Sequence, residues 1–169
     1  PGQDGLVLKN VSLKSGNRMR LDSISLSLGR GEILGIAGVD GNGQKELAEV
    51  ILGITKHSQG VIRLGELDIS QMSILERKKL GIGYISDDRH GDGLVLDMDL
   101  TENMLLKTHT ERNFIKHGLL RNKLIREDTQ KAVEEYNIKT QSLDIPIRYL
   151  SGGNQQKLIL ARELAGAPR

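Results

Sequence analysis

The chain has 169 residues, enough for one domain, and its core must be aliphatic because aromatic residues make up only 2%. The 24 Lys and Arg nearly balance the 22 Asp and Glu, so the net charge of +2 gives no strong field to attract DNA or anionic lipid. Cysteine is absent, which excludes disulfides and thiolate metal sites, and no apolar stretch approaches the ~18 residues that span a bilayer. We therefore expect a soluble, cytosolic domain that binds no nucleic acid and reaches a membrane only through a partner.

The first segment predicts an antiparallel pair of strands. Apolar and polar side chains alternate over Leu6 to Leu13 and over Arg18 to Leu28, and Ser15-Gly16-Asn17 forms the turn between them. A one-residue slip in the alternation between Leu21 and Ile24 predicts a β-bulge.

The next segment has the pattern of a strand, a glycine-rich loop and a helix. An apolar run over Ile33 to Ala37 leads into the loop, and a helical pattern then continues to about Gly53. Such a loop presents backbone N–H groups at a helix N-terminus, where unpaired donors and the helix dipole attract an anion, and phosphate is the anion it suggests.

The loop matches the phosphate-binding pattern G-x-x-x-x-G-K-[ST] only in its glycines, Gly38 and Gly43. Gln44 stands at the lysine position and Lys45 at the position of the magnesium-binding hydroxyl. Losing the lysine contact costs roughly 1.5 to 3 kcal/mol, and a cation in place of the hydroxyl removes a ligand and adds repulsion. Lys45 need not restore the contact, because one residue along a helix turns the side chain by about 100°. A glycine-rich turn without a ligand is the alternative.

Short elements are predicted after this helix. GVIRL at 60–64 predicts a strand, and Ser73 with Glu76 forms a capping box that opens a short helix closed by Gly81. A brief strand is expected over Ile82 to Ile85.

The remaining elements before the C-terminal segment are a loop and helices. Ser86 to Gly93 is a charged, glycine-bearing loop, for which a solvated connection is the alternative. Helices are predicted over Thr101 to Lys107 and Lys123 to Tyr136. The order of the elements indicates an α/β core that carries a helical subdomain.

A second anion site is predicted where the string LSGGNQQK at 150–157 opens a helix. Ser151 is a natural N-cap, and Gly152 and Gly153 let a ligand approach bare N–H groups. A cap with a hinge and no ligand is the alternative. The apolar face expected to follow is formed by Leu158, Ala161, Leu164 and Ala165, and the helix is expected to stop at Ala167-Pro168.

This string is similar to the signature motif of ATP-binding cassette (ABC) ATPases, in the form found in importers of sugars and nucleosides. Residues 35–44 resemble the Walker A segment, 81–89 resemble the strand and Q-loop, and 91–96 with 101–103 continue the likeness. The resemblance covers nearly the whole chain and implies the second of two cassettes, in which Walker A is commonly degenerate.

The implied fold is an α/β P-loop NTPase core with an antiparallel β subdomain and a helical signature subdomain, C-terminally incomplete. We expect one partial nucleotide-binding domain over 1–169. Its expected parts are the antiparallel start at 1–31, the Walker A region and core at 32–85, the Q-loop and helical subdomain at 86–150, and the signature motif with its helix at 150–169.

The chain departs from the family pattern in several places. Besides Gln44 and Lys45, Asp87 replaces the Q-loop glutamine, and no aromatic residue near Leu13 to Arg20 can stack on adenine. The Walker B strand and the catalytic residues that follow it would lie beyond Arg169, so we expect this polypeptide alone to be inactive. Family strands from that segment lie between 33–37 and 82–85, and we therefore expect these two strands not to pair directly.

The resemblance implies head-to-tail cassettes, in which Ser151, Gly152, Gly153 and Asn154 hold the γ-phosphate of ATP on a partner cassette. The chain's own loop is expected to bind ATP weakly, with magnesium weak or absent there. No catalytic residue or metal ligand is assigned. The expected nucleotide-binding residues are Gly38, Val39, Asp40, Gly41, Asn42, Gly43, Gln44, Lys45, Glu46, Asp87, Ser151, Gly152, Gly153, Asn154 and Gln155.

The implied function is that of an ATP-binding subunit of a sugar or nucleoside importer, with a weak lean to nucleosides. The expected partners are a second cassette (in the same polypeptide or a dimer mate), transmembrane permease subunits and, indirectly, a solute-binding protein. The expected location is peripheral, on the cytoplasmic face of the inner membrane. A non-hydrolytic regulatory or assembly module is the alternative. DNA-repair and translation ABC ATPases usually carry long coiled-coil or basic insertions, and neither is visible in this sequence. A kinase or GTPase would need the lysine that Gln44 replaces, and it would give no reason for the string LSGGNQQK.

Overall fold

The computed structural model describes residues 4–108, 114–116 and 118–165, and the chain divides into two compact units, 1–82 and 83–169. No helix within the described part of the chain is long and apolar enough to cross a membrane.

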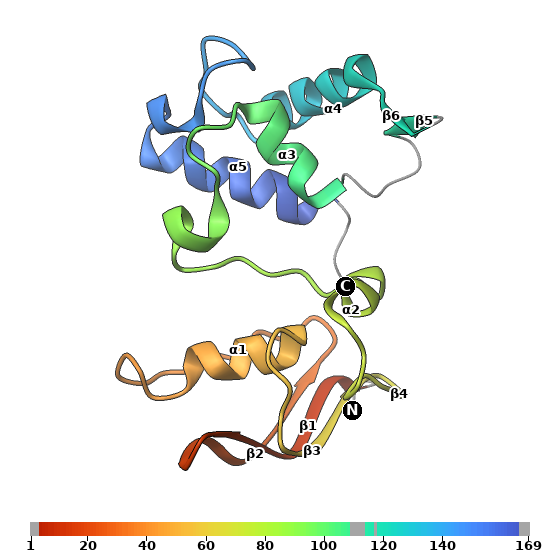
Figure 1. Cartoon of the computed structure of the whole chain (residues 1–169), viewed down its shortest axis with the longest axis vertical. Helices are drawn as coiled ribbons and strands as arrows, with labels where there is room; N and C mark the ends of the chain where they lie inside the picture. Colours follow the sequence, from red (N-terminus) through yellow and green to blue (C-terminus); the bar gives the residue numbers. More distant parts are fainter. Residues whose placement is uncertain (1–3, 109–113, 117, 166–169) are drawn as a thin grey trace. The chain divides into compact units, whose positions relative to one another are not determined.

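The first unit is built on an antiparallel sheet with the strand order β2-β1-β3-β4 (Figure 1). Its strands are β1 (Asp4–Ser15), β2 (Arg18–Gly29), β3 (Gln59–Leu64) and β4 (Leu67–Asp68). The predicted pair and its turn are confirmed. The predicted bulge is confirmed too, because the pairing slips between Val11↔Ile24 and Leu13↔Leu21, and Ser23 has a positive φ of 49°.

Helix α1 (Gln44–Leu52) buries Leu47 and Val50 in the apolar core of this unit, together with side chains from the sheet. The helix ends at Gly53, whose φ of 81° is a left-handed C-cap. Helix α2 (Ile74–Lys79) begins with the predicted capping box, in which the Ser73 hydroxyl accepts from the Glu76 N–H and the Glu76 carboxylate accepts from the Ser73 N–H. The Ser73 hydroxyl and the Ser73 N–H both donate to the Glu76 carboxylate, and these two bonds, the hydroxyl first, hold the pKa of Glu76 below its usual value.

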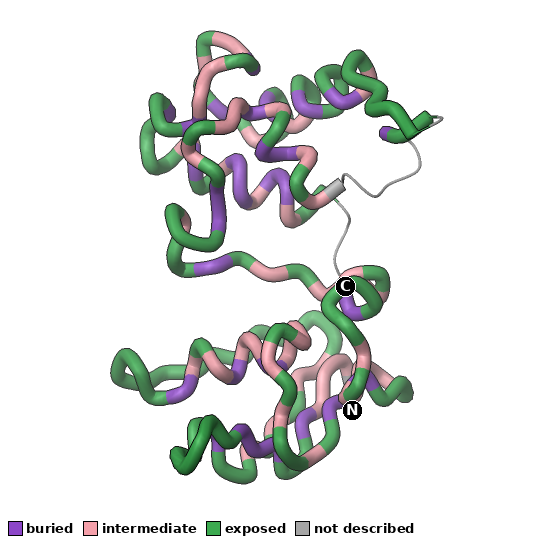
Figure 2. Tube along the Cα trace, viewed as in Figure 1, coloured by how far each residue is buried: buried purple, intermediate pink, exposed green. Residues whose placement is uncertain are grey.

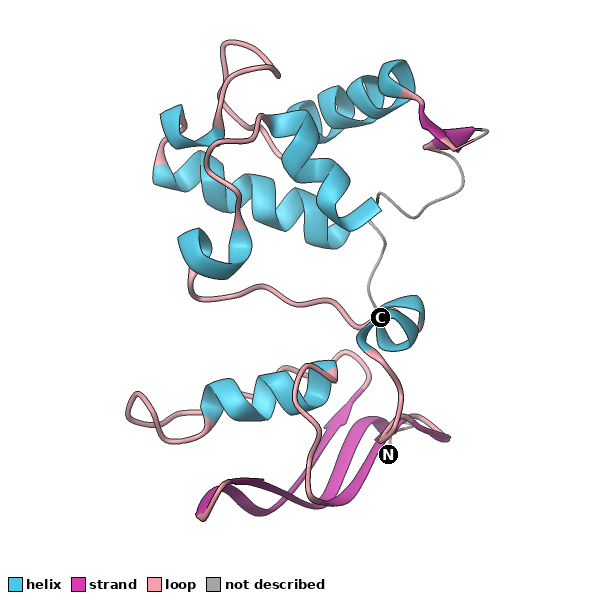
Figure 3. Ribbon diagram, viewed as in Figure 1, coloured by secondary structure: helices cyan, strands magenta, loops and turns pink. Residues whose placement is uncertain are grey.

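Two predicted strands are wrong. Residues 33–37 and 82–85 form no strand and are drawn as loop in Figure 3. A β-strand needs a neighbour for its backbone N–H and C=O groups, and no described strand pairs with either segment. The side chains of 33–37 are therefore exposed, and Ile33 is 97% exposed, whereas Ile82 is partly buried against the core of the first unit. Because neither segment is a strand, the expectation that the two strands do not pair with each other stays a prediction.

The second unit is helical, with the predicted helices confirmed as α3 (Leu100–Thr108), α4 (Asn122–Glu135) and α5 (Gly152–Leu164). A π-helical turn, η1 (Arg89–Gly93), precedes α3, and a 3-10 turn, η2 (Ile147–Tyr149), lies between α4 and α5. The two short strands β5 (Ile115–Lys116) and β6 (Leu119–Leu120) pair antiparallel between α3 and α4.

The core of the second unit lies between the helices, and Figure 2 shows buried positions recurring along α4 and α5. Ile125, Thr129 and Val133 form the buried face of α4, four residues apart as one face of a helix requires. On α5, Leu158 and Ala161 are buried as predicted, whereas Leu164 and Ala165 are exposed, because the packed face ends before the last turn. The predicted stop at Ala167-Pro168 lies outside the described residues.

Candidate functional site

The glycine-rich loop before α1 is folded back on itself by the side chain of Gln44. The Gln44 Nε2 donates to the Val39 carbonyl at 3.2 Å, and a Cβ at Gly38 would collide with this amide. Gly41 and Gly43 have φ angles of 80° and 100°, so the sharp turn into the helix requires glycine. The position that holds a lysine in the phosphate-loop pattern therefore carries a neutral side chain that bonds its own loop.

The charged side chains around this loop do not converge on one point. Lys45 is exposed, and Glu46 lies in the first turn, where its carboxylate is 3.5 Å from the Arg20 guanidinium. A carboxylate in this turn competes with any anion that approaches the helix N-terminus. Asp40 and Asn42 are exposed in the loop itself.

The residues near this loop do not fit a magnesium ion. Among the described residues, no group of His, Cys, Asp and Glu is arranged to hold a metal. Lys45 occupies the position of the usual hydroxyl ligand, and its ammonium group repels a divalent cation.

The start of α5 leaves two backbone N–H groups exposed. Ser151 caps the helix by accepting from the Asn154 N–H, and Ser151, Gly152 and Gly153 are all exposed. The structure gives no hydrogen bond from the N–H groups of Gly152 or Gly153 to any residue that it describes. A Cβ at Gly153 would meet nothing within 4 Å. Two adjacent backbone donors at the positive end of the helix dipole are thus open to a ligand.

The next residues of the motif are turned toward the protein. The Asn154 side chain donates to the Ser151 hydroxyl at 3.0 Å and accepts from the Lys139 N–H at 2.9 Å. Gln155 is buried, and its Nε2 donates to the carbonyls of Ile147 and Leu150. The Gln155 side chain therefore anchors the start of α5 to the preceding turn and does not lie beside the exposed N–H groups of Gly152 and Gly153.

The loop over 86–93 contains a turn closed by its own hydrogen bonds. The Asp88 carboxylate accepts from the N–H groups of His90 and Gly91, and this closes the turn η1. Asp87 is exposed and accepts from the Asp88 N–H at 3.1 Å. Arg89 donates to the Gly152 carbonyl at 2.9 Å, a contact that the sequence pattern did not indicate.

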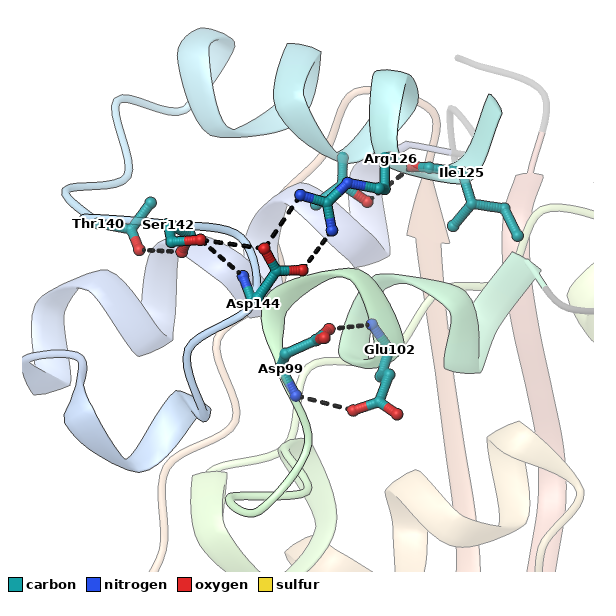
Figure 4. A network of polar contacts seen from close by, with 8 residues as sticks. Asp99, Glu102, Ile125, Arg126, Thr140, Ser142 and Asp144 are labelled. Carbon is teal, nitrogen blue, oxygen red and sulfur yellow. Dashed lines mark hydrogen bonds and ion pairs between the residues drawn. The ribbon is translucent and has the colours of Figure 1, made fainter. Parts of the chain in front are cut away.

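An ion pair links α4 to the segment that leads to the signature string. The Arg126 guanidinium forms a two-point contact with the Asp144 carboxylate, which also accepts from the Ser142 hydroxyl (Figure 4). These contacts, Arg126 first, hold the pKa of Asp144 below its usual value of 3.8. Nearby, at the start of α3, the Asp99 carboxylate accepts from the Glu102 N–H and the Glu102 carboxylate accepts from the Asp99 N–H.

Acid is expected to weaken this unit partly through Asp144. Because its folded pKa lies below its unfolded one, the ionised carboxylate contributes stability that is present above pH ~3.8 and is lost as the pH falls through the folded pKa. Asp144→Asn should therefore flatten the acid limb of a stability–pH curve measured by urea unfolding. Asp128→Asn removes an exposed carboxylate outside this network and should leave the limb unchanged. An acid limb in Asp144→Asn as steep as in the wild type would contradict the expectation.

A comparison with protein families matches residues 21–169 to the family described as ABC transporter. The chain belongs to this family. As a member, it has the P-loop NTPase fold of an ABC cassette, as its sequence predicted.

Several curated relatives of this ABC chain are import ATP-binding proteins. It is 37% identical over 164 residues to the nucleoside import ATP-binding protein NupA of Lactococcus lactis, covering 96% of the chain and 32% of the relative. It is 37% identical over 169 residues to the guanosine import ATP-binding protein NupO of Bacillus subtilis, covering 99% and 33%. It is 39% identical over 167 residues to the ribose import ATP-binding protein RbsA of Clostridium perfringens, covering 99% and 32%. The chain spans about a third of the length of these relatives.

Solved ABC cassettes share the fold. A dimeric cassette, MJ0796, in a post-hydrolysis state bound to ADP and Pi superposes with a TM-score of 0.74 at 22% identity, covering 96% of this chain and 70% of that one. The cassette MJ1267 superposes with a TM-score of 0.77 at 24% identity, covering 98% and 66%.

Proposed function

We propose that this ABC chain is part of an ATP-binding subunit of an importer for simple sugars or nucleosides, and that the start of its α5 completes the ATP site of a second cassette. The names of its relatives, which import nucleosides, guanosine and ribose, support the substrate class. The proposed partners are a second cassette, in the same polypeptide or a dimer mate, and transmembrane permease subunits, with a solute-binding protein indirectly. The proposed location is the cytoplasmic face of the membrane.

The observation that carries this proposal is the open space at Gly153. A glycine in a helix costs up to about 1 kcal/mol relative to alanine. The described residues do not require it, because a Cβ there would meet nothing within 4 Å and the backbone φ is not positive. A glycine that its own fold does not need is understandable if another molecule comes close to the bare backbone.

The chemistry available there suits a terminal phosphate. The N–H groups of Gly152 and Gly153 and the hydroxyl proton of Ser151 would donate to its oxygens. Magnesium and the nucleotide itself would be held by the partner cassette, whose bound ATP supplies the phosphoryl group. Donors aimed at charge that develops during phosphoryl transfer lower the barrier. ATP hydrolysis by the assembled transporter carrying Gly153→Asp tests the assignment, and loss of turnover is the expected result.

The chain's own loop is proposed to bind ATP weakly and to hydrolyse none. The folded-back Gln44, the exposed Lys45 and the carboxylate of Glu46 support this part of the proposal. Isothermal titration of the chain with ATP and magnesium should show no tight binding. The matched variant Gln44→Lys with Lys45→Thr restores the pattern of a phosphate loop, and it should bind roughly ten- to a hundredfold more tightly, as one charge-assisted contact predicts. Submicromolar binding by the unmodified chain would contradict the proposal.

A non-hydrolytic regulatory or assembly role is the second candidate, because the same folded-back loop is compatible with it. The two functions differ in one result. An importer subunit hydrolyses ATP when it is assembled with its permease and second cassette, whereas a regulatory module leaves ATP hydrolysis unaffected when its signature residues are changed.

A further inference from the structure

The turn η1 is fastened along α5 by contacts that begin at the signature residues. The Arg89 Nη1 donates to the Gly152 carbonyl at 2.9 Å, and the His90 Nε2 lies 3.1 Å from the Gln155 Oε1. Figure 1 shows this turn, in yellow-green, beside α5. The first turn of α5 is thus held from outside by two side chains of one short element.

The far end of the same turn is fixed as well. The buried guanidinium of Arg162 donates to the Gly93 carbonyl at 2.7 Å, and a Cβ on Gly93 would come within 3.0 Å of the Ile159 Cδ1. Because both ends of η1 are attached to α5, Arg89 is presented from a rigid support and not from a free loop.

Arg89 binds the peptide group that also carries the Gly153 N–H. The carbonyl of Gly152 and the N–H of Gly153 belong to one planar peptide group. A donor on the carbonyl therefore fixes the direction of that N–H, and it also polarises the N–H, since hydrogen bonds in a chain strengthen one another by perhaps 10–30%. This fixing matters most between two glycines, whose backbone is the least restricted of all residues.

We propose that Arg89 is a positioning residue, whose guanidinium orients and polarises the Gly153 N–H toward the terminal phosphate of the nucleotide on the partner cassette. This inference rests on the proposed function of the α5 start. Space at Gly152 is part of the arrangement, because a Cβ there would lie 3.1 Å from the Arg89 Nη1 and would press on the guanidinium.

The test is the ATPase activity of the assembled transporter as a function of ATP concentration. Arg89→Ala should lower kcat roughly tenfold, less than the 10²–10³ expected for removing an oxyanion donor outright. KM for ATP should change less than about twofold, because the rest of the nucleotide is held by the partner cassette. Arg89→Lys, which keeps a cationic donor, should recover most of kcat. Lys123→Ala, which removes a 93% exposed cation, should change neither parameter.

A second variant covers the case in which Arg89→Ala does not assemble. Gly152→Ala keeps the arginine but crowds it, and it should lower kcat in the same way. The inference is overturned if Arg89→Ala keeps full kcat, if its loss appears in KM alone, or if lysine recovers nothing. If Gly153→Asp abolishes turnover while Arg89→Ala does not affect it, only this inference fails. If Gly153→Asp is also fully active, the proposed function fails with it.

Discussion

Replacing Gly153 with aspartate is expected to abolish ATP hydrolysis by the assembled transporter. The new carboxylate would project from the exposed start of α5 into the space proposed for the terminal phosphate. The carboxylate and the phosphate are both negative, and two like charges in contact repel each other strongly when water is excluded. The oxyanion donors would also be blocked. Turnover should fall by at least about 10²-fold, as when an oxyanion donor is lost.

The same substitution should leave the fold intact, which makes the result interpretable. The added side chain would meet no described atom within 4 Å, and an acidic residue in the first turn of a helix is favoured by the helix dipole. Urea unfolding of the chain should therefore show an unchanged or slightly higher stability. Gly153→Ala is the matched control, since it adds a methyl group without charge and should retain more activity than aspartate. Unchanged turnover in Gly153→Asp would remove the basis of the proposed function.

The elements that could be predicted from the sequence are those fixed by neighbouring residues. The hairpin of β1 and β2 depends on local alternation and a three-residue turn, and even its bulge was visible as a slip in the pattern. The capping box of Ser73 and Glu76 and the N-cap of Ser151 are equally local, and both were found where expected. Such features need no knowledge of the rest of the fold.

The features that the sequence did not predict depend on partners distant in the chain. An apolar run becomes a strand only beside another strand. The run at 33–37 has the apolar pattern of a strand, but no described strand pairs with it. Arg89 and Gly152 are 63 positions apart, and no periodicity links them. Gln44 was recognised as a departure from a phosphate loop, but its bond to the Val39 carbonyl depends on the loop conformation.

Arg77 is a further residue whose role only the structure reveals, and replacing it with methionine is expected to destabilise the first unit by about 3 kcal/mol or more. The side chain is 3% exposed, and burial lowers its pKa. Its Nη1 donates at 2.7 Å to the carbonyls of both Val50 and Ile51, at the C-terminal end of α1. The Val50 carbonyl also accepts from the Gly53 N–H at 3.2 Å, whereas Arg77 supplies the donor for the Ile51 carbonyl, and its cation complements the helix dipole.

The guanidinium also donates to the carbonyls of Met72 and Ser70, each at 3.1 Å. Methionine would fill similar volume but leave the carbonyls of Ile51, Met72 and Ser70 without this donor, and each buried acceptor that is left unpaired costs about 1–3 kcal/mol. The Val50 carbonyl would keep its bond from the Gly53 N–H at 3.2 Å. Urea unfolding followed by circular dichroism should show a lower midpoint with an unchanged slope. The unfolding midpoint of Arg77→Lys should lie between those of the wild type and Arg77→Met, because one ammonium group cannot reproduce the planar fork of the guanidinium. Lys79→Met, on the exposed face of the same helix, should cost far less. An Arg77→Met chain within about 0.5 kcal/mol of the wild type, the range of an ordinary surface change, would mean that water replaces the guanidinium at these carbonyls.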